Sequence, residues 1–323
     1  MTEPPDEFAW IDRLSPLTRG DSRALRLLDD AAVIPGRPGH DLVVSKDAMV
    51  EGVHFPEGAS PDLVARRLLR TNLSDLAAKA AEPFGYFLMT AWPSDRTWAD
   101  REAFIRGLAE DGEAFGVSLL GGDTVRTPGP LTLSATVLGW TPSGRAVLRS
   151  GARPGHAAVV CGPIGDGRLG LLASKGEISD ADGSLAAHYY TPRPLLCLRP
   201  LLQGLARAAA DVSDGLLADS GAIARASGVG VSLDLGRLPL SAGGAAWLSA
   251  QPDPASSRLA LATGGDDYAV VCAIEAAEVA TFVKGAAALG VSAVAIGVFE
   301  DAPGVRAAFE GLPLALTELG WRH

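Results

Sequence analysis

The spacing of apolar residues predicts strands and helices in alternation along the first half of the chain. Short apolar runs bounded by Gly, Asp or Ser predict strands, and apolar residues three and four apart predict helices. The expected strands are a buried one at 42–44, an apolar one following Asp29-Asp30, and 84–90, 117–120 and 131–139. The expected helices are a short one carrying Phe8, Ile11 and Leu14, and those at 61–81 and 100–115. We expect turns at Glu51-Gly52 and at residues 121–124, with His54 on a second short extended piece.

The second half continues the alternation. Its expected strands are 157–161, 229–235, 268–274 and 294–298, and its expected helices are 195–209, 216–226 and 278–288. Because strands and helices interleave throughout, the expected fold class is mixed α/β (α+β). The Pro, Ser and Gly residues of segment 141–145 predict a boundary between domains at 1–140 and 149–323.

Composition favours a compact globular protein and excludes several classes of partner. The 323 residues are 47% hydrophobic, with a mean hydropathy of +0.19 and a net charge of −10. Such an acidic chain is unsuited to nucleic acid or anionic membrane as its main partner. The acidic start resembles no signal peptide, and no apolar run approaches the roughly 18 residues of a membrane span. We therefore expect a cytoplasmic protein, with its three dispersed cysteines reduced.

Aspartates recur at the ends of apolar segments, usually beside Gly, Ser or Asn. They are centred on the stretch 42–55, in which Ser45, Lys46 and Asp47 follow an apolar run. Magnesium takes hard oxygen ligands and is often shared between carboxylates and phosphates. We therefore expect the aspartates to converge on Mg2+ ions that carry nucleotide phosphates. The residues concerned are Asp30, Asp47, Asp75, Asp123, Asp211 and Asp214.

Motifs of other enzyme classes are absent from the sequence. It contains no GxxxxGK[ST] phosphate loop, no protein-kinase motif set and no GxGxxG at a strand–helix turn. It also has no GxSxG nucleophile elbow, and its five histidines lack paired metal-ligand spacing. Carboxylates and glycine turns therefore remain as the chemistry-bearing features.

Each acidic motif also has an ordinary structural explanation. Asp75 could form an exposed helical pair with Lys79. The run 211–214 could cap the helix beginning at Leu216. The Gly-Gly-Asp segments could be simple turns, and His54 a satisfied histidine without a ligand. One common site accounts for all six aspartates with a single hypothesis.

Seven motifs occur in an order that resembles a known family. They are DDAAV (29–33), KDAMVEGVHF (46–55), NLSDLAA (72–78), GGDT (121–124), RSGARPG (149–155), DVSDGL (211–216) and GGDDY (264–268). Together they resemble the thiamine-monophosphate kinase family, in the superfamily of aminoimidazole ribonucleotide synthetase and selenophosphate synthetase. The resemblance implies a two-domain PurM-like fold. Its N-terminal domain would bind ATP and Mg2+ and form a shared β-barrel at the interface of a homodimer, beside a C-terminal α/β domain.

The resemblance also implies roles for individual residues. Magnesium ligands would come from Asp30, Ser45, Lys46, Asp47, Asp75, Asp123, Asp211 and Asp214. ATP would contact Gly122, Asp123, Arg149 and Ser213, and thiamine phosphate would contact His54, Asp266 and Trp321. Three positions depart from the family pattern: Leu28 replaces Gly, Lys46 replaces Thr, and Asp266 replaces Glu.

The implied reaction is direct in-line transfer of the ATP γ-phosphoryl group to thiamine monophosphate, which gives thiamine diphosphate without a phosphoenzyme. The second pKa of a phosphate monoester is about 6, so the attacking oxygen needs no strong base. Cations are needed to bring two polyanions together, and Mg2+ and Arg149 would supply them. Trp321 could stack on the cationic thiazolium ring, or simply close the core.

Two other functions stay open on the sequence. The first is another ATP-using synthetase of the superfamily. A selenophosphate synthetase is disfavoured among these, because it would have a reactive cysteine early in the chain, and the first here is Cys161. The second is a non-catalytic nucleotide-binding maturation protein, which would not need six aspartates as metal ligands.

Overall fold

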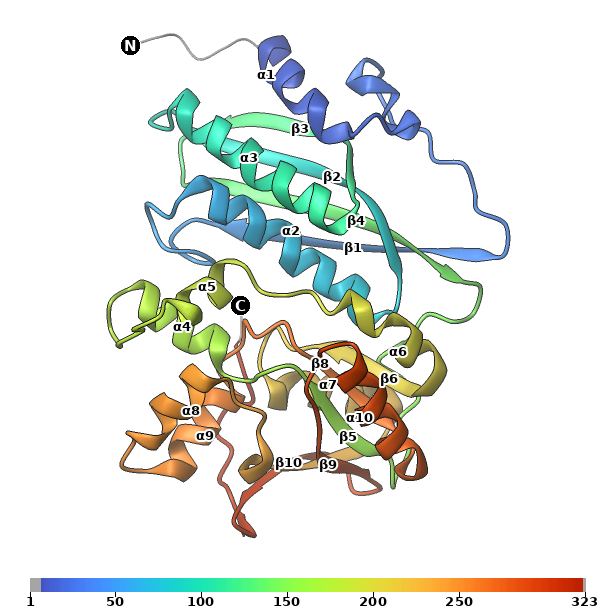
Figure 1. The fold of residues 1–323 in the computed structure, drawn as a ribbon, viewed down its shortest axis with the longest axis vertical. Coiled ribbons are helices and arrows are strands. Elements are labelled where there is room, and N and C mark those ends of the chain that lie inside the picture. The colour runs from blue at the N-terminus through green and yellow to red at the C-terminus, as the bar shows by residue number, and fades with distance from the viewer. Residues whose placement is uncertain (1–6, 322–323) are drawn as a thin grey trace. The chain divides into compact units, whose positions relative to one another are not determined.

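The computed structural model describes residues 7–321, which divide into two compact units (Figure 1). The N-terminal unit contains the residues up to Leu76 together with Ala81–Gly144. The C-terminal unit contains Ala77–Ala80 and the residues from Arg145 onward. No helix in the described part of the chain is long and apolar enough to cross a membrane.

The N-terminal unit is built on a four-stranded sheet with the order β1-β4-β2-β3. Its strands are β1 (His40–Val50), β2 (Glu82–Pro93), β3 (Ser118–Thr127) and β4 (Thr132–Pro142). Strand β4 pairs antiparallel with β1 and β2, whereas β2 and β3 are parallel. Two long helices, α2 (Pro61–Ala78) and α3 (Trp98–Phe115), cover one face of this sheet (Figure 1). The chain reaches β1 through α1 (Glu7–Leu14), η1 (Ser15–Thr18) and η2 (Ser22–Leu27).

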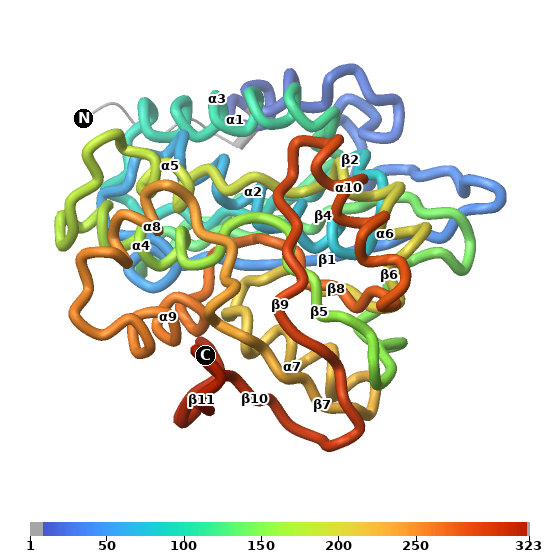
Figure 2. Tube along the Cα trace, turned by 60° about the horizontal axis from the view of Figure 1, so that its bottom comes forward, coloured from blue at the N-terminus to red at the C-terminus, as the bar shows by residue number. Residues whose placement is uncertain are grey.

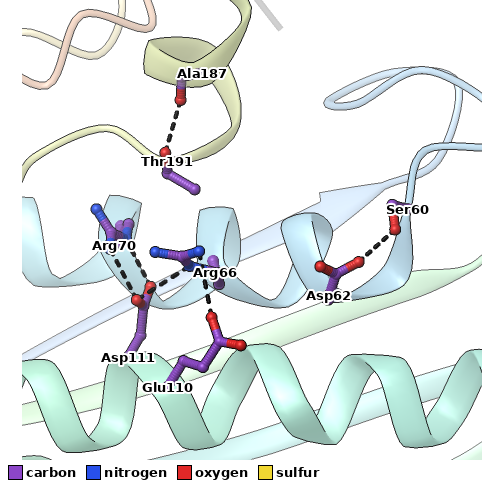
Figure 3. A network of polar contacts seen from close by, with 8 residues as sticks. All are labelled: Ser60, Asp62, Arg66, Arg70, Glu110, Asp111, Ala187 and Thr191. Carbon is purple, nitrogen blue, oxygen red and sulfur yellow. Dashed lines mark hydrogen bonds and ion pairs between the residues drawn. The ribbon is translucent and has the colours of Figure 1, made fainter.

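The helical periodicity of α2 explains how this core forms. Leu68 and Leu76 on one side of the helix are fully buried against alternate residues of β4, among them Leu133 and Val137. Arg66 and Arg70 of α2 both bond the buried carboxylate of Asp111 on α3, as Figure 3 shows. The two helices are thus joined by charge as well as by apolar packing. The expected helices at 61–81 and 100–115, and the short helix near Ile11, are confirmed within one to three residues.

Several expectations for the N-terminal unit are wrong. Strand β1 is not buried: it is an edge strand, and Leu42 and Val44 expose 44% and 53% of their surface. No strand follows Asp29-Asp30. Residues 121–124 do not turn, because β3 continues through them to Thr127 in parallel pairing with β2. His54 lies inside the turn after Glu51 rather than on an extended piece.

The C-terminal unit contains a seven-stranded sheet with the order β11-β10-β7-β9-β5-β8-β6. The strands are β5 (Ala157–Cys161), β6 (Ala206–Asp211), β7 (Gly230–Asp234), β8 (Val270–Ile274), β9 (Ala293–Glu300), β10 (Gly304–Phe309) and β11 (Leu312–Pro313). Their pairings are antiparallel except that of β7 with β10. Val159 and Val160 contribute to different hydrophobic clusters, as expected when successive side chains alternate between the faces of a sheet.

Helices surround this sheet. They are α4 (Asp166–Ser174), α5 (Ser184–Tyr190), α6 (Arg199–Leu205), α7 (Leu216–Ser227), α8 (Ala242–Ser249), α9 (Pro254–Ala262) and α10 (Val279–Ala288), with short 3-10 turns η3 (Leu196–Leu198), η4 (Leu235–Arg237) and η5 (Ala276–Glu278). Buried residues of α7 belong to the same hydrophobic cluster as Val160, and those of α10 belong to the same cluster as Val159. Helices α4, α5, α8 and α9 gather beside the sheet around Leu169, Leu185 and Leu261 (Figure 2).

The expected helix at 195–209 is only partly correct. It ends at Leu205, and the chain then becomes strand β6, paired with β8. Ala208, Ala209 and Ala210 are almost fully buried there. Alanine favours helices in isolation, and burial within the sheet overrides that preference. The three cysteines are free, as expected.

Candidate functional site

In the N-terminal unit, side chains of β1 and α2 meet in two hydrogen-bonded pairs. Ser45 Oγ donates to Asp75 Oδ2 over 2.6 Å. The Asp47 N–H donates to Asn72 Oδ1 over 2.9 Å, and Asn72 Nδ2 donates to the Leu68 carbonyl over 2.8 Å. Asn72 is fully buried, so its amide orientation is fixed by both bonds. The structure therefore brings Ser45, Asp47 and Asp75 together.

Lys46 belongs to a different group of contacts. Its Nζ donates to Ser134 Oγ on β4 over 2.6 Å, and Ser134 Oγ donates to the Asp47 carbonyl over 2.8 Å. The ammonium group is thus fixed to the neighbouring strand. This contact gives Lys46 a structural role beside the expected site residues Ser45 and Asp47.

A cavity of about 320 Å3 in the same unit contains three further expected residues. Asp30, Gly122 and Asp123 line it, together with apolar side chains that include Phe87. A side chain at Gly122 would overlap the Leu88 carbonyl oxygen, so only glycine permits this close approach of β3 to β2. The cavity combines an apolar wall with three exposed carboxylates, those of Asp29, Asp30 and Asp123.

His54 lies in the turn that follows Glu51. Its Nδ1 accepts a hydrogen bond from the Val50 N–H over 3.1 Å, across the turn that follows β1. His54 is half-buried. The expected contact with thiamine phosphate therefore stays a prediction, beside an observed role in the turn.

In the C-terminal unit, the turn at residues 212–215 links three distant segments. The N–H of Asp266 donates to the Ser213 carbonyl, and the N–H of Trp321 donates to the Asp214 carbonyl, both over 2.8 Å. A side chain at Gly320 would overlap the Asp214 carbonyl oxygen, so glycine allows the C-terminal segment to approach. The structure thus joins four expected residues through their backbones.

Asp219, on the first turn of α7, binds the same turn from its other side. Its Oδ2 accepts hydrogen bonds from the N–H groups of Ser213, Asp214 and Gly215 over 3.1, 3.1 and 3.2 Å. Asp219 is 3% exposed. Burial, and next the charge of Asp214, raise the pKa of its carboxyl to about 7, although the backbone bonds and Arg149 act in the opposite direction.

A cavity of about 290 Å3 opens beside this turn. Its lining includes three residues expected from the sequence, Arg149, Asp214 and Trp321, and two that were not expected, Asp219 and Arg225. A pocket with guanidinium groups, carboxylates and an exposed indole suits a ligand that carries both phosphate and a cationic ring.

Asp211 and Asp266 occupy more restricted positions. Asp211 ends β6 opposite Val270 and is 4% exposed. Asp266 has a left-handed backbone with φ of 62°, and Tyr268 Oη donates to its Oδ1 over 3.0 Å. The alternative in which residues 211–214 cap α7 is not observed, because the carboxylate that binds the turn is that of Asp219.

The oxygen donors of the site suit Mg2+ that is bound together with water and phosphate. Within residues 7–321, no three His, Cys, Asp or Glu side chains are grouped closely enough to hold a metal ion by themselves. Mg2+ commonly uses one or two carboxylates and completes its octahedron with water and substrate phosphates. The hydroxyl–carboxylate pair of Ser45 and Asp75, and the exposed carboxylates of Asp30 and Asp123, fit that pattern.

Sequence reasoning missed Asp219, Arg225 and the positioning role of Asn72. Asp219 lies within an apolar helical segment, where a carboxylate suggests no more than a favourable charge on the first turn. The signal that could have identified it is the absence of a conventional cap at Gly215, which leaves backbone N–H groups requiring an acceptor.

Comparison with known proteins gives consistent matches over both units. Residues 28–141 match AIR synthase related protein, N-terminal domain, and residues 153–310 match AIR synthase related protein, C-terminal domain. A thiamine-monophosphate kinase of Caulobacter vibrioides is 58% identical over 321 residues, covering 99% of this chain and 91% of that relative.

Two solved structures share the fold. The thiamine-monophosphate kinase from Stenotrophomonas maltophilia K279a has a TM-score of 0.84 and 33% identity, covering 96% of this chain and 98% of that chain. AaThiL complexed with AMPPCP and TMP has a TM-score of 0.78 and 26% identity, covering 98% and 96%. The expected two-domain mixed α/β fold is confirmed.

Proposed function

The chain belongs to the thiamine-monophosphate kinase family, with two PurM-like domains, and we propose that it phosphorylates thiamine monophosphate to thiamine diphosphate with ATP. The observation that carries this proposal is the 58% identity, over 99% of the chain, to the Caulobacter vibrioides kinase. The likeness to AaThiL complexed with AMPPCP and TMP supports a nucleotide and thiamine monophosphate as the two ligands.

In the N-terminal unit we assign metal and nucleotide binding to the residues around β1 and the 320 Å3 cavity. Asp30, Ser45, Asp47, Asp75 and Asp123 would hold Mg2+, and Gly122, which lines the cavity, would contact ATP through its backbone. When bound, Mg2+ would neutralise phosphate oxygens and align the γ-phosphoryl group for in-line transfer. Lys46 enters this assignment through its backbone, since Ser134 holds its ammonium group.

In the C-terminal unit we assign phosphate and substrate binding to the 290 Å3 cavity and the neighbouring turn. Arg149 would donate hydrogen bonds to phosphate, and Trp321 would stack on the thiazolium ring. Ser213 would contact ATP, and Asp211 and Asp214 would contact metal. Asp266, held by Tyr268, would attract the cationic substrate.

The residues fit direct transfer without a covalent intermediate. The acceptor is a phosphate monoester, which is largely deprotonated at neutral pH, so none of the assigned residues has to act as a base. Asp75, Asp123 and Arg149 instead bind and orient charged groups.

We also propose a homodimer formed through the sheet of the N-terminal unit. Val43 and Met49 of β1 pack on the side of α2, whereas the alternate residues Leu42 and Val44 are exposed. An exposed apolar edge strand is otherwise an aggregation hazard, and a second subunit would cover it. The cytoplasmic location remains a prediction.

The test is ADP release by purified protein with Mg2+ and ATP, followed with and without thiamine monophosphate. The proposal predicts release that requires thiamine monophosphate. Equal release without it would favour another ATP-using enzyme of the superfamily, and nucleotide binding without release would favour a maturation protein.

A further inference from the structure

The turn before helix α7 is held by a residue that has no role in the function proposed above. Helix α7 has Gly215 at its N-cap and no side-chain cap bond, so the amides before its first turn need an acceptor from elsewhere. Asp219 supplies it: one oxygen, Oδ2, accepts the N–H groups of Ser213, Asp214 and Gly215. Three bonds to one carboxylate oxygen fix the orientation of three consecutive peptide groups.

The carbonyl groups of the same turn are fixed as well. The Ser213 carbonyl accepts the N–H of Asp266, and the Asp214 carbonyl accepts the N–H of Trp321. The backbone polar groups of Ser213 and Asp214 are therefore all engaged within the protein, which leaves their side chains available to a ligand. The turn also connects the segments that carry Asp266 and Trp321, so its geometry affects both of them.

We propose that Asp219 is a positioning residue, which sets the turn so that Ser213 faces the nucleotide, Asp214 faces the metal ion, and Asp266 and Trp321 face thiamine monophosphate. This inference rests on the proposed function for the identity of the two ligands. Its structural part, the fixing of the turn by one carboxylate, rests on the three hydrogen bonds alone.

Two other roles for Asp219 make different predictions. If Asp219 only stabilised the start of α7, its loss would lower the unfolding temperature and leave ligand affinity unchanged. If its carboxylate were a direct ligand in the 290 Å3 cavity that it lines, an amide would be as damaging as a methyl group. A positioning residue is distinguished by rescue, because the Oδ1 of asparagine can still accept the three N–H groups.

The experiment compares the full-length wild type with Asp219→Ala, Asp219→Asn and Asp253→Asn. Asp253 is the matched control, since its carboxylate also accepts backbone N–H groups at a helix start, from Ala255 and Ser256 of α9. Calorimetry measures the Kd of AMPPCP with Mg2+ and of thiamine monophosphate. Hydrogen exchange in the ligand-free protein reports directly on the amides of residues 213–215.

Asp219→Ala is expected to raise the Kd of both ligands by about 10-fold or more, the usual cost of losing a group that orients a binding residue. Its three turn amides should also exchange at least about 10-fold faster. Asp219→Asn should remain within about threefold of wild type, because neutral hydrogen bonds keep the geometry at roughly half the strength. Asp253→Asn should match wild type in both measurements.

The inference is overturned if Asp219→Ala binds both ligands like wild type, if Asp219→Asn loses as much affinity as Asp219→Ala, or if the turn amides keep their protection. Should Asp219→Ala fail to fold, Asp219→Ser decides in its place by the same thresholds, because its single, shorter hydroxyl cannot accept all three N–H groups. A wild type that binds AMPPCP without phosphorylating thiamine monophosphate would refute the proposed function, while the exchange and AMPPCP comparisons would still decide the role of Asp219.

Discussion

Ser45 on strand β1 donates a 2.6 Å hydrogen bond to Asp75 on helix α2. Two residues further along β1, the N–H of Asp47 is held by Asn72, three residues before Asp75 on the helix. Positions two apart share one face of a strand, and positions three apart share one face of a helix. Both hydrogen-bonded pairs therefore lie where the same face of β1 meets the same face of α2. Two motifs distant in sequence thus make one rigid set of oxygen donors.

Replacing Asp75 by Asn should abolish most of the kinase activity and leave the fold intact. The amide keeps the size of the side chain but loses the charge that we assign to metal binding. We expect kcat to fall by at least about 100-fold, as for other groups that stabilise transition-state charge. The control is Asp95→Asn, in an exposed turn of the same unit. Near-normal turnover of Asp75→Asn, with wild-type Mg2+ dependence, would refute the metal assignment.

Gly320→Ala should impair the use of thiamine monophosphate. The added methyl group would overlap the Asp214 carbonyl and displace Trp321, which now donates its N–H to that carbonyl. Misplacing a binding group by about 1 Å can cost as much as 100-fold, and we expect KM for thiamine monophosphate to rise about 10-fold or more.

The matched control for this change is Gly204→Ala on α6, where an added Cβ would meet no atom within 4 Å. It should bind substrate normally and be slightly more stable, because alanine favours a helix by up to about 1 kcal/mol over glycine. A normal KM in Gly320→Ala would contradict the role given to the C-terminal segment.

The ion pairs between the arginines of α2 and Asp111 of α3 predict a change in stability that does not depend on the proposed function. Asp111 has a side chain 1% exposed and bonds Arg66 Nε over 3.2 Å and Arg70 Nε over 2.6 Å. Asp111→Ala leaves two partly buried guanidinium groups without this partner and should cost about 3 kcal/mol of unfolding free energy. Glu110→Ala removes a carboxylate that is 62% exposed and 3.3 Å from Arg66, and should cost no more than about 0.5 kcal/mol. Equal losses in urea unfolding of the two variants would contradict this distinction.

The raised pKa of Asp219 predicts how stability varies with pH in the ligand-free protein. Its carboxyl has a pKa of about 7 when folded, against an ordinary value of 3.8, so between these pH values the folded state binds more protons. The contribution of this protonation to the free energy of unfolding is therefore fully present below about pH 4. It is lost as pH rises through about 7, with a slope of at most about 1.4 kcal/mol per pH unit.

Asp219→Asn cannot titrate, so its unfolding free energy should fall less than that of wild type between about pH 5 and pH 8. Chemical unfolding of both proteins at each pH, without Mg2+ or nucleotide, measures the difference. Parallel curves would show that the pKa of Asp219 is not raised in the folded protein.

Local patterns predicted most of the regular elements because their causes are local. The three- and four-residue spacing of leucines in 61–81 is sufficient for α2, and Gly116 ends α3 with φ of 67°. The errors arose where distant partners decide the outcome. Residues 121–124 look like a turn, yet pairing with β2 extends them as strand, and the alanines after Leu205 form β6 because β8 lies beside them.

In the candidate site, too, some features follow from the local sequence and others depend on distant partners. The aspartates could be selected by residue type and by motif order, and the structure pairs several of them with nearby donors, as for Ser45 and Asp75. Asp219 could not be selected, because its role depends on three backbone N–H groups whose direction only the folded turn defines. Lys46 is a similar case: its sequence position does not decide whether its backbone or its side chain serves the metal site, and the folded structure bonds the ammonium group to Ser134 Oγ.

The proposed reaction is direct phosphoryl transfer from ATP to thiamine monophosphate. The most direct measurement is phosphorus NMR of the purified protein with Mg2+, ATP and thiamine monophosphate, followed over time. We predict that the signals of thiamine diphosphate and ADP grow at equal rates, without inorganic phosphate. ADP accompanied by inorganic phosphate, with the thiamine monophosphate signal unchanged, would contradict direct transfer to thiamine monophosphate.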